Sequence, residues 1–370
     1  MNRTYMPMID NGLFVAEYYL EMPYYDITID VLYENVDLFS QKMSDCIETS
    51  EFYRKIVYST HMNSSLTQSA RNKSKFLLIR DQLKDLLDNV GKDKACLYCG
   101  EEQVNINYKI DRKFMYGLIS QTFYNSANNL QTVDVCTVCA YLSMLSILNI
   151  QKIGMPTLYI SDSDNFMRAI TKQIQNLTID ELDIDSNQKT TELVNKSFII
   201  DEIPGYITQF CFQNAGQIVN DVERTFSSKD IKLLRKLKDN NLLDEFMEHG
   251  LHNNLALDRE LITDITYCSP DLIKLLEEYD LKEKERKIVD YATKTLLEME
   301  DAEKLLKELK LCNTKQKFNN FLLQYSEKKA LVEDVKDYDI LTGYNWYKYR
   351  DYINMNILIY KDREVKSNDQ

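Results

Sequence analysis

Glycine and proline are scarce in this chain of 370 residues, which has nine glycines and five prolines. A β sandwich with many turns needs frequent sharp reversals, so the scarcity argues against that class of fold and favours long helices. The composition, 44% hydrophobic and 28% charged, is typical of a globular protein. We therefore expect a helix-rich fold with a sizeable core.

Histidine is also rare, with His61, His249 and His252 as the only three. This limits acid/base chemistry near neutral pH and hydrolytic metal sites. His249 and His252 lie three residues apart, but we find no carboxylate or cysteine at matching spacing and do not predict a ligand set there. The chain lacks a Walker loop, G-x-S-x-G, G-x-G-x-x-G and H-E-x-x-H. These observations favour a binding or assembly protein over an enzyme.

Neither an excess of positive charge nor a membrane-spanning run is present. The net charge of −13 would repel a phosphate backbone, so any nucleic-acid contact must use a local patch. The longest apolar run, residues 135–150, is too short for a comfortable membrane span and holds polar residues. The first residues, MNRTYMPMIDNG, have no basic or apolar region of a signal peptide. We expect no membrane partner.

The cysteines carry the clearest motif. CLYCG contains Cys96 and Cys99, and CTVCA contains Cys136 and Cys139. Two C-x-x-C pairs complete a four-thiolate shell, the usual structural Zn²⁺ site, and we predict these four residues as its ligands. Two alternatives remain: a thioredoxin-like dithiol, which needs one pair at a helix start, and thiols buried as small apolar residues. Zinc thiolates need a reducing compartment, and the other four cysteines show no disulfide spacing, so we expect a cytoplasmic protein.

A basic segment surrounds the first pair, since residues 71–113 hold ten Lys or Arg against seven Asp or Glu. A basic face on an acidic protein favours docking on a specific partner. The plainer interpretation is a solvated helix face, because Asp81, Asp85 and Asp88 supply partners one turn away.

Hydrophobic periodicity predicts an α+β, helix-rich chain of two domains. Residues 1–225 form a mixed α/β domain that contains the zinc module at about 91–150, and residues 226–370 form an all-helical bundle. We expect a core helix within 27–59, with Leu32, Val36, Phe39, Met43 and Ile47 as its apolar stripe, and another helix over 76–90.

Later in the first domain, an apolar helix follows Cys139, and strands are predicted at 157–160, 197–200 and 206–212. The polar stretch 179–195 is expected to be an exposed loop. In the second domain, Ser228, and Ser269 followed by Pro270, are predicted helix starts.

The order of these features resembles the CXXC/CXXC family of large subunits of type I CRISPR effector complexes (I-B-like Cascade). The resemblance rests on CLYCG, the Asn-rich FYNSANN, CTVCA leading into an apolar helix, and FQNAGQ, and it covers roughly residues 90–220. Members of that family are usually longer, and this chain is strongly acidic for a DNA-binding subunit.

The resemblance implies a non-catalytic subunit in antiviral defence that contacts guide RNA and other subunits, recognises the motif beside the double-stranded DNA target, and helps recruit the helicase-nuclease. On this hypothesis the candidates for RNA or DNA contact are Arg112, Lys113, Asn125, Asn128, Asn214 and Gln217. For each amide, the alternative role is to cap a loop.

Two other functions remain open. An acidic protein of this kind could mimic DNA and inhibit a nucleic-acid enzyme, although Lys and Arg alternate with the acids here. A zinc-stabilised nuclease or a dithiol enzyme would instead need a second metal cluster or a reactive thiol of lowered pKa.

Overall fold

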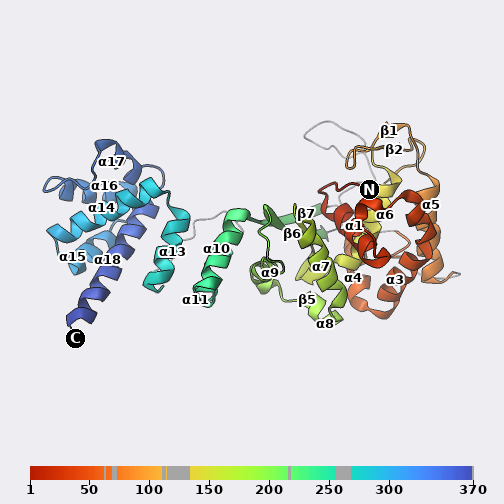
Figure 1. Ribbon diagram of the computed structural model, residues 1–370, viewed down its shortest axis with the longest axis horizontal. Helices are drawn as coiled ribbons and strands as arrows, with labels where there is room; N and C mark the ends of the chain where they lie inside the picture. Colours follow the sequence, from red (N-terminus) through yellow and green to blue (C-terminus); the bar gives the residue numbers. More distant parts are fainter. Residues whose placement is uncertain are drawn as a thin grey trace. The chain divides into compact units, whose positions relative to one another are not determined.

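The computed structural model describes residues 1–61, 64–68, 73–110, 114, 134–215, 218–255 and 268–368. It divides into two compact units, Met1–Lys232 (unit 1) and Leu233–Gln370 (unit 2), and the division falls inside helix α10 (Ser228–Asp239). The predicted class is confirmed, because the fold is helix-rich, with a small sheet and a four-cysteine cluster in its N-terminal half (Figure 1). Each unit is described in turn.

Unit 1 contains a five-stranded sheet in the order β5-β3-β4-β6-β7. The strands are β3 (Gln151–Ile153), β4 (Met155–Ser161), β5 (Asp183–Ile184), β6 (Tyr206–Ala215) and β7 (Ile218–Ser227). All neighbours are antiparallel except β3 and β5. The central strand β4 is buried from Pro156 onward, in agreement with its mostly apolar sequence.

Helix α1 (Pro7–Leu20) crosses helix α6 (Thr137–Leu145) in the core of unit 1. Every residue of α6 is buried, as its apolar sequence predicts. The two backbones approach closely at Gly12, where an added Cβ would overlap the carbonyl oxygen of Leu142. The other helices are α2 (Ile29–Glu34), α3 (Val36–Thr49), α4 (Glu51–Thr60), α5 (Lys75–Asp88), α7 (Asp164–Asn176), α8 (Ile179–Leu182) and α9 (Lys189–Lys196).

A buried ion pair fixes the start of α1. Arg3 Nε lies 3.0 Å from Asp10 Oδ2, and the two side chains are 5% and 0% exposed. Arg3 Nη1 also lies 3.0 Å from Asp164 Oδ1 at the start of α7, while the backbone N–H of Thr4 donates to Asp10 Oδ1. Both charges are therefore hydrogen-bonded, as burial of an ion pair requires.

Several local predictions are corrected by the structure. Residues 27–59 form α2, α3 and α4 rather than one helix, although all five predicted stripe residues are buried. The loop predicted at 179–195 is wrong: the segment holds α8, β5 and most of α9, and it buries Leu182, Thr190 and Leu193. Residues 197–200 form turns and not a strand, and β7 was not predicted.

The described residues of unit 2 contain helices only. After α10 come α11 (Leu243–Glu248), α12 (His252–Leu255), α13 (Pro270–Asp280), α14 (Glu283–Met299), α15 (Ala302–Lys310), α16 (Lys315–Ser326), α17 (Val335–Leu341) and α18 (Trp346–Asn368). The long helix α18 packs against α13 to α17 and is central to the bundle (Figure 1). Ser269 caps α13, with Pro270 at the first helical position, as predicted.

Candidate metal centre

The four cysteines of the two C-x-x-C pairs meet in unit 1. Their sulfur atoms all lie within 4.8 Å of one another. Cys96 Sγ is 3.8 Å from Cys139 Sγ, and Cys99 Sγ is 3.8 Å from Cys136 Sγ. A tetrahedral zinc ion with Zn–S bonds of about 2.3 Å places its sulfur ligands about 3.8 Å apart. The cluster therefore has the size and donor set to bind a metal ion.

The first pair is presented by a tight turn. Strands β1 (Lys94–Ala95) and β2 (Glu102–Val104) form a short antiparallel hairpin, which the turn closes. The N–H of Gly100 donates to the carbonyl oxygen of Cys96 over 2.9 Å, and Gly100 has a φ of +74°. A residue with a side chain rarely adopts this conformation, so glycine after the second cysteine favours the turn.

The second pair begins helix α6. Cys136 is its N-cap, and the Cys136 sulfur accepts the N–H of Cys139 over 3.4 Å. The N–H of Cys136 in turn donates to Cys96 Sγ over 3.3 Å, which links the pairs directly. A helix N-terminus stabilises negative charge, so this position favours thiolates.

Burial and mutual contact set the protonation of the four thiols. Cys96, Cys136 and Cys139 are buried, and Cys99 is half-buried. Contacts with the sulfur atoms of Cys136, Cys139 and Cys99 hold the pKa of Cys96 far below its usual range. Contacts with the other three sulfur atoms, together with burial, raise the pKa of Cys139. Four adjacent thiolates repel one another, and a divalent cation removes that repulsion.

A cavity of about 680 Å³ adjoins this centre. Its lining includes Cys99 and Cys139 of the centre, Val138 of α6, and Ile27 and Asp30 from the N-terminal part of unit 1. The surface beside the cysteines is therefore hollow and partly apolar.

A second group of metal-ligand types occurs in unit 2. Ligand atoms of Glu245, His249 and Cys268 all lie within 4.8 Å of one another. The expectation that no carboxylate matches the histidines in spacing is wrong, because it rested on the pair of His249 and His252 and passed over Glu245. The signal available was a carboxylate four residues before His249, which is one turn of helix; Cys268 is brought close only by the tertiary fold.

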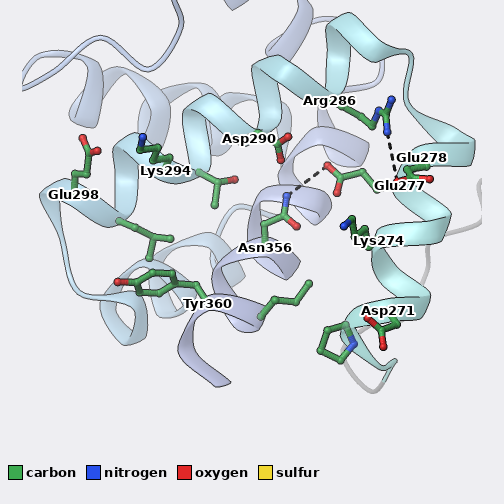
Figure 2. Close-up of a pocket in the computed structure, with 14 residues that line it drawn as sticks. Asp271, Lys274, Glu277, Glu278, Arg286, Asp290, Lys294, Glu298, Asn356 and Tyr360 are labelled. Carbon is green, nitrogen blue, oxygen red and sulfur yellow. Dashed lines mark hydrogen bonds and ion pairs between the residues drawn. The ribbon is translucent and has the colours of Figure 1, made fainter. Parts of the chain in front are cut away.

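A cavity of about 700 Å³ lies in unit 2 between α13, α14 and α18. Figure 2 shows Asn356 donating to Glu277 Oε1 over 3.4 Å, and Arg286 paired with Glu278 over 3.8 Å. Burial, and then repulsion from Asp290, raise the pKa of Glu277 to about 7. The wall of this cavity therefore holds an acid that is partly protonated near neutral pH.

The predicted nucleic-acid contacts cannot be placed around these sites. Arg112, Lys113, Asn125, Asn128 and Gln217 lie outside the described residues. The backbone of Asn214 lies in β6, paired with Val219 of β7, and its side chain is outside the described ones. These six assignments stay predictions.

Comparisons with protein-family models, curated proteins and solved structures found no match to this chain. Within the described parts of the chain, none of the helices combines the length and apolar character needed to cross a membrane.

Proposed function

We propose that the four-cysteine centre binds zinc as a structural ion, and that the chain is a non-catalytic subunit of a nucleic-acid-targeting assembly. The observation that carries the proposal is the pair of 3.8 Å sulfur contacts that join the turn of Cys96 and Cys99 to the start of α6. Thiolate donors in tetrahedral spacing favour zinc over hard cations such as Mg²⁺ or Ca²⁺.

A structural role is favoured over a catalytic one by the number of ligands. Four thiolates fill a tetrahedral shell and leave no position for a substrate or a reactive water. The ion would fasten a hairpin of two short strands to the fully buried helix α6. The zinc would therefore hold the surface around the hairpin, including the adjoining cavity, in one conformation for a partner.

The specific form of the proposal follows from the sequence resemblance. The chain would be the large subunit of an I-B-like type I CRISPR complex, in the cytoplasm, where thiolates stay reduced. It would contact guide RNA and neighbouring subunits, recognise the motif beside the double-stranded DNA target, and help recruit the helicase-nuclease. Because RNA and other subunits share the binding of DNA, the net charge of −13 is compatible with this role.

The zinc assignment is tested by elemental analysis of the purified chain. Cys96→Ser combined with Cys136→Ser should remove one zinc ion per chain and lower assembly with partner subunits. Cys46→Ser combined with Cys312→Ser is the matched control, since neither residue belongs to a ligand group. If the ligand variant holds as much zinc per chain as the control variant, or if the wild type holds none, the assignment is wrong.

The assembly is tested by native purification from the source cells, followed by identification of bound RNA and proteins. Guide RNA together with backbone subunits is the expected result. Arg112→Ala with Lys113→Ala should then weaken binding of the target duplex and reduce its salt slope by about two, one for each phosphate contact. A nuclease partner without RNA would instead support an acidic inhibitor that mimics DNA, and a chain with neither would contradict both functions.

A further inference from the structure

Glu245, His249 and Cys268 combine the three side-chain types that bind zinc. Glu245 lies on α11 and His249 is the C-cap of that helix, so a spacing of four residues places them on the same face. Cys268 directly precedes Ser269, the N-cap of α13. The Cys268 side chain is buried and His249 is exposed, so the group reaches from the interior of unit 2 to its surface.

The carboxylate of Glu245 is already held in a fixed orientation. Ser269 Oγ donates to Glu245 Oε2 over 2.8 Å, and the backbone N–H of Ser269 donates to Oε1. An ionised carboxylate has about four lone-pair positions, so these two bonds leave room for a metal. Hydrogen bonds of this kind orient the carboxylate ligands in established metal sites.

We propose that Glu245, His249 and Cys268 form a second metal site, which takes a divalent transition ion such as zinc and leaves one coordination position for an exchangeable water. A thiolate and an imidazole exclude Mg²⁺ and Ca²⁺ as preferred ions, and a site of mixed sulfur, nitrogen and oxygen donors suits zinc. The site goes beyond the proposed function and does not depend on it.

The geometry requires only a small contraction. Zinc bonds of about 2.0–2.3 Å place tetrahedral ligand atoms about 3.3–3.8 Å apart, and the three atoms are now within 4.8 Å. The exposed imidazole of His249 can supply this movement by rotating about its side-chain bonds, because it is not packed in the core. A bound ion would then join α11 to the start of α13.

Three protein ligands distinguish this site from the four-cysteine centre. The open position makes the second ion accessible to water and small ligands, whereas the first ion would be enclosed by four sulfur atoms. We therefore expect the second ion to exchange faster and to be removed first by a chelator.

Metal titration of the full-length chain tests the proposal. The wild type should bind two zinc ions, and His249→Ala or Glu245→Gln should bind one. Glu248→Gln, an exposed acid on the same helix, is the matched control and should retain two. With cobalt in place of zinc, Cys268→Ser should remove about one fifth of the thiolate charge-transfer absorption, since one of five thiolates is lost.

Substitutions at each site distinguish zinc binding at the four-cysteine centre from zinc binding at the second site. Cys96→Ser with Cys136→Ser should abolish the first ion and leave the second, which His249→Ala then removes. If His249→Ala disturbs the fold, Glu245→Gln tests the second site instead. Its amide oxygen still accepts a hydrogen bond from Ser269, while the carboxylate ligand of the metal is lost. A wild-type chain that binds one ion, or a second ion that survives both His249→Ala and Glu245→Gln, overturns the proposal.

Discussion

Removal of the metal from the four-cysteine centre should destabilise unit 1 and leave unit 2 unchanged. The hairpin that carries Cys96 and Cys99 contains strands of two and three residues, which cannot hold it to α6 by backbone pairing alone. The sulfur atoms contribute to the connection, together with a hydrogen bond from the Leu97 N–H to the carbonyl oxygen of Asp134 and the exposed Lys94–Asp134 pair. A chelator therefore removes a ligand that binds the folded state and not the unfolded chain.

The magnitude follows from mass action. Free zinc at 100 times its dissociation constant stabilises the folded state by about 2.7 kcal/mol. Unit 1 comprises Met1–Lys232, and in domains of that size each 1 kcal/mol shifts the melting temperature by about 2–4 °C. Chelation should therefore lower the melting temperature of unit 1 by about 5–11 °C.

The single tryptophan makes the assay specific. Trp346 is the only tryptophan in the chain and lies in unit 2, so its fluorescence follows unit 2, while far-ultraviolet circular dichroism follows both units. The experiment uses His249→Ala, in which any second ion has been removed. Chelation should shift the dichroism transition of unit 1 and not the fluorescence transition. Equal melting curves with and without chelator would refute a stabilising metal at the four cysteines.

Three substitutions test other parts of the fold. Gly12→Ala should destabilise unit 1 by at least about 1–3 kcal/mol, because its methyl group would overlap a carbonyl oxygen of α6; an unchanged melting temperature would contradict this close approach. Asp10→Ala should cost about 2–5 kcal/mol in urea unfolding, since Arg3 Nε and the backbone N–H of Thr4 lose their buried acceptor, although Arg3 keeps its pair with Asp164. Glu51→Ala, at an exposed pair, should cost under about 1 kcal/mol. Burial raises the pKa of Glu277 from 4.5 to about 7, so its contribution to stability is full below pH 4.5 and is lost as the pH rises through 7. Glu277→Gln should thus be more stable than the wild type by up to about 3 kcal/mol at pH 8 and equal to it at pH 4 in urea unfolding; parallel pH profiles would contradict a buried acid.

The four-cysteine centre could be predicted from the sequence because its geometry is local. Each C-x-x-C pair presents two sulfur atoms from one turn, and the count of two pairs completes the shell. The helix after Cys139 was equally clear, since all of its residues are apolar or small and it starts at the second pair. A local signal also found the cap of α13, where Ser269 accepts a backbone N–H.

The features that could not be predicted from the sequence, in α1, α9 and the group around Cys268, depend on tertiary contacts. Helix α1 buries nine consecutive residues, including Asp10 and Asn11, so it shows no amphipathic period to recognise. The sequence of α9 is mostly polar, yet Leu193 and Val194 are buried in the fold. Cys268 follows His249 by 19 positions, a separation that no spacing rule connects.

The basic segment near the first cysteine pair offers less positive charge in the folded chain than its residue count implies. Lys73 pairs with Asp81, Arg80 with Asp37 and Lys94 with Asp134, at 2.7, 2.6 and 3.1 Å. Lys75 is buried and donates to backbone carbonyl oxygens of the preceding loop. Exposed ion pairs of this kind are weak, so a phosphate group of the nucleic acid can replace the Asp as partner of the Lys or Arg. Each such exchange leaves an unpaired carboxylate close to the nucleic acid. Few counterions would then be released per contact, so most of the affinity of the proposed complex for DNA has to come from guide RNA and neighbouring subunits.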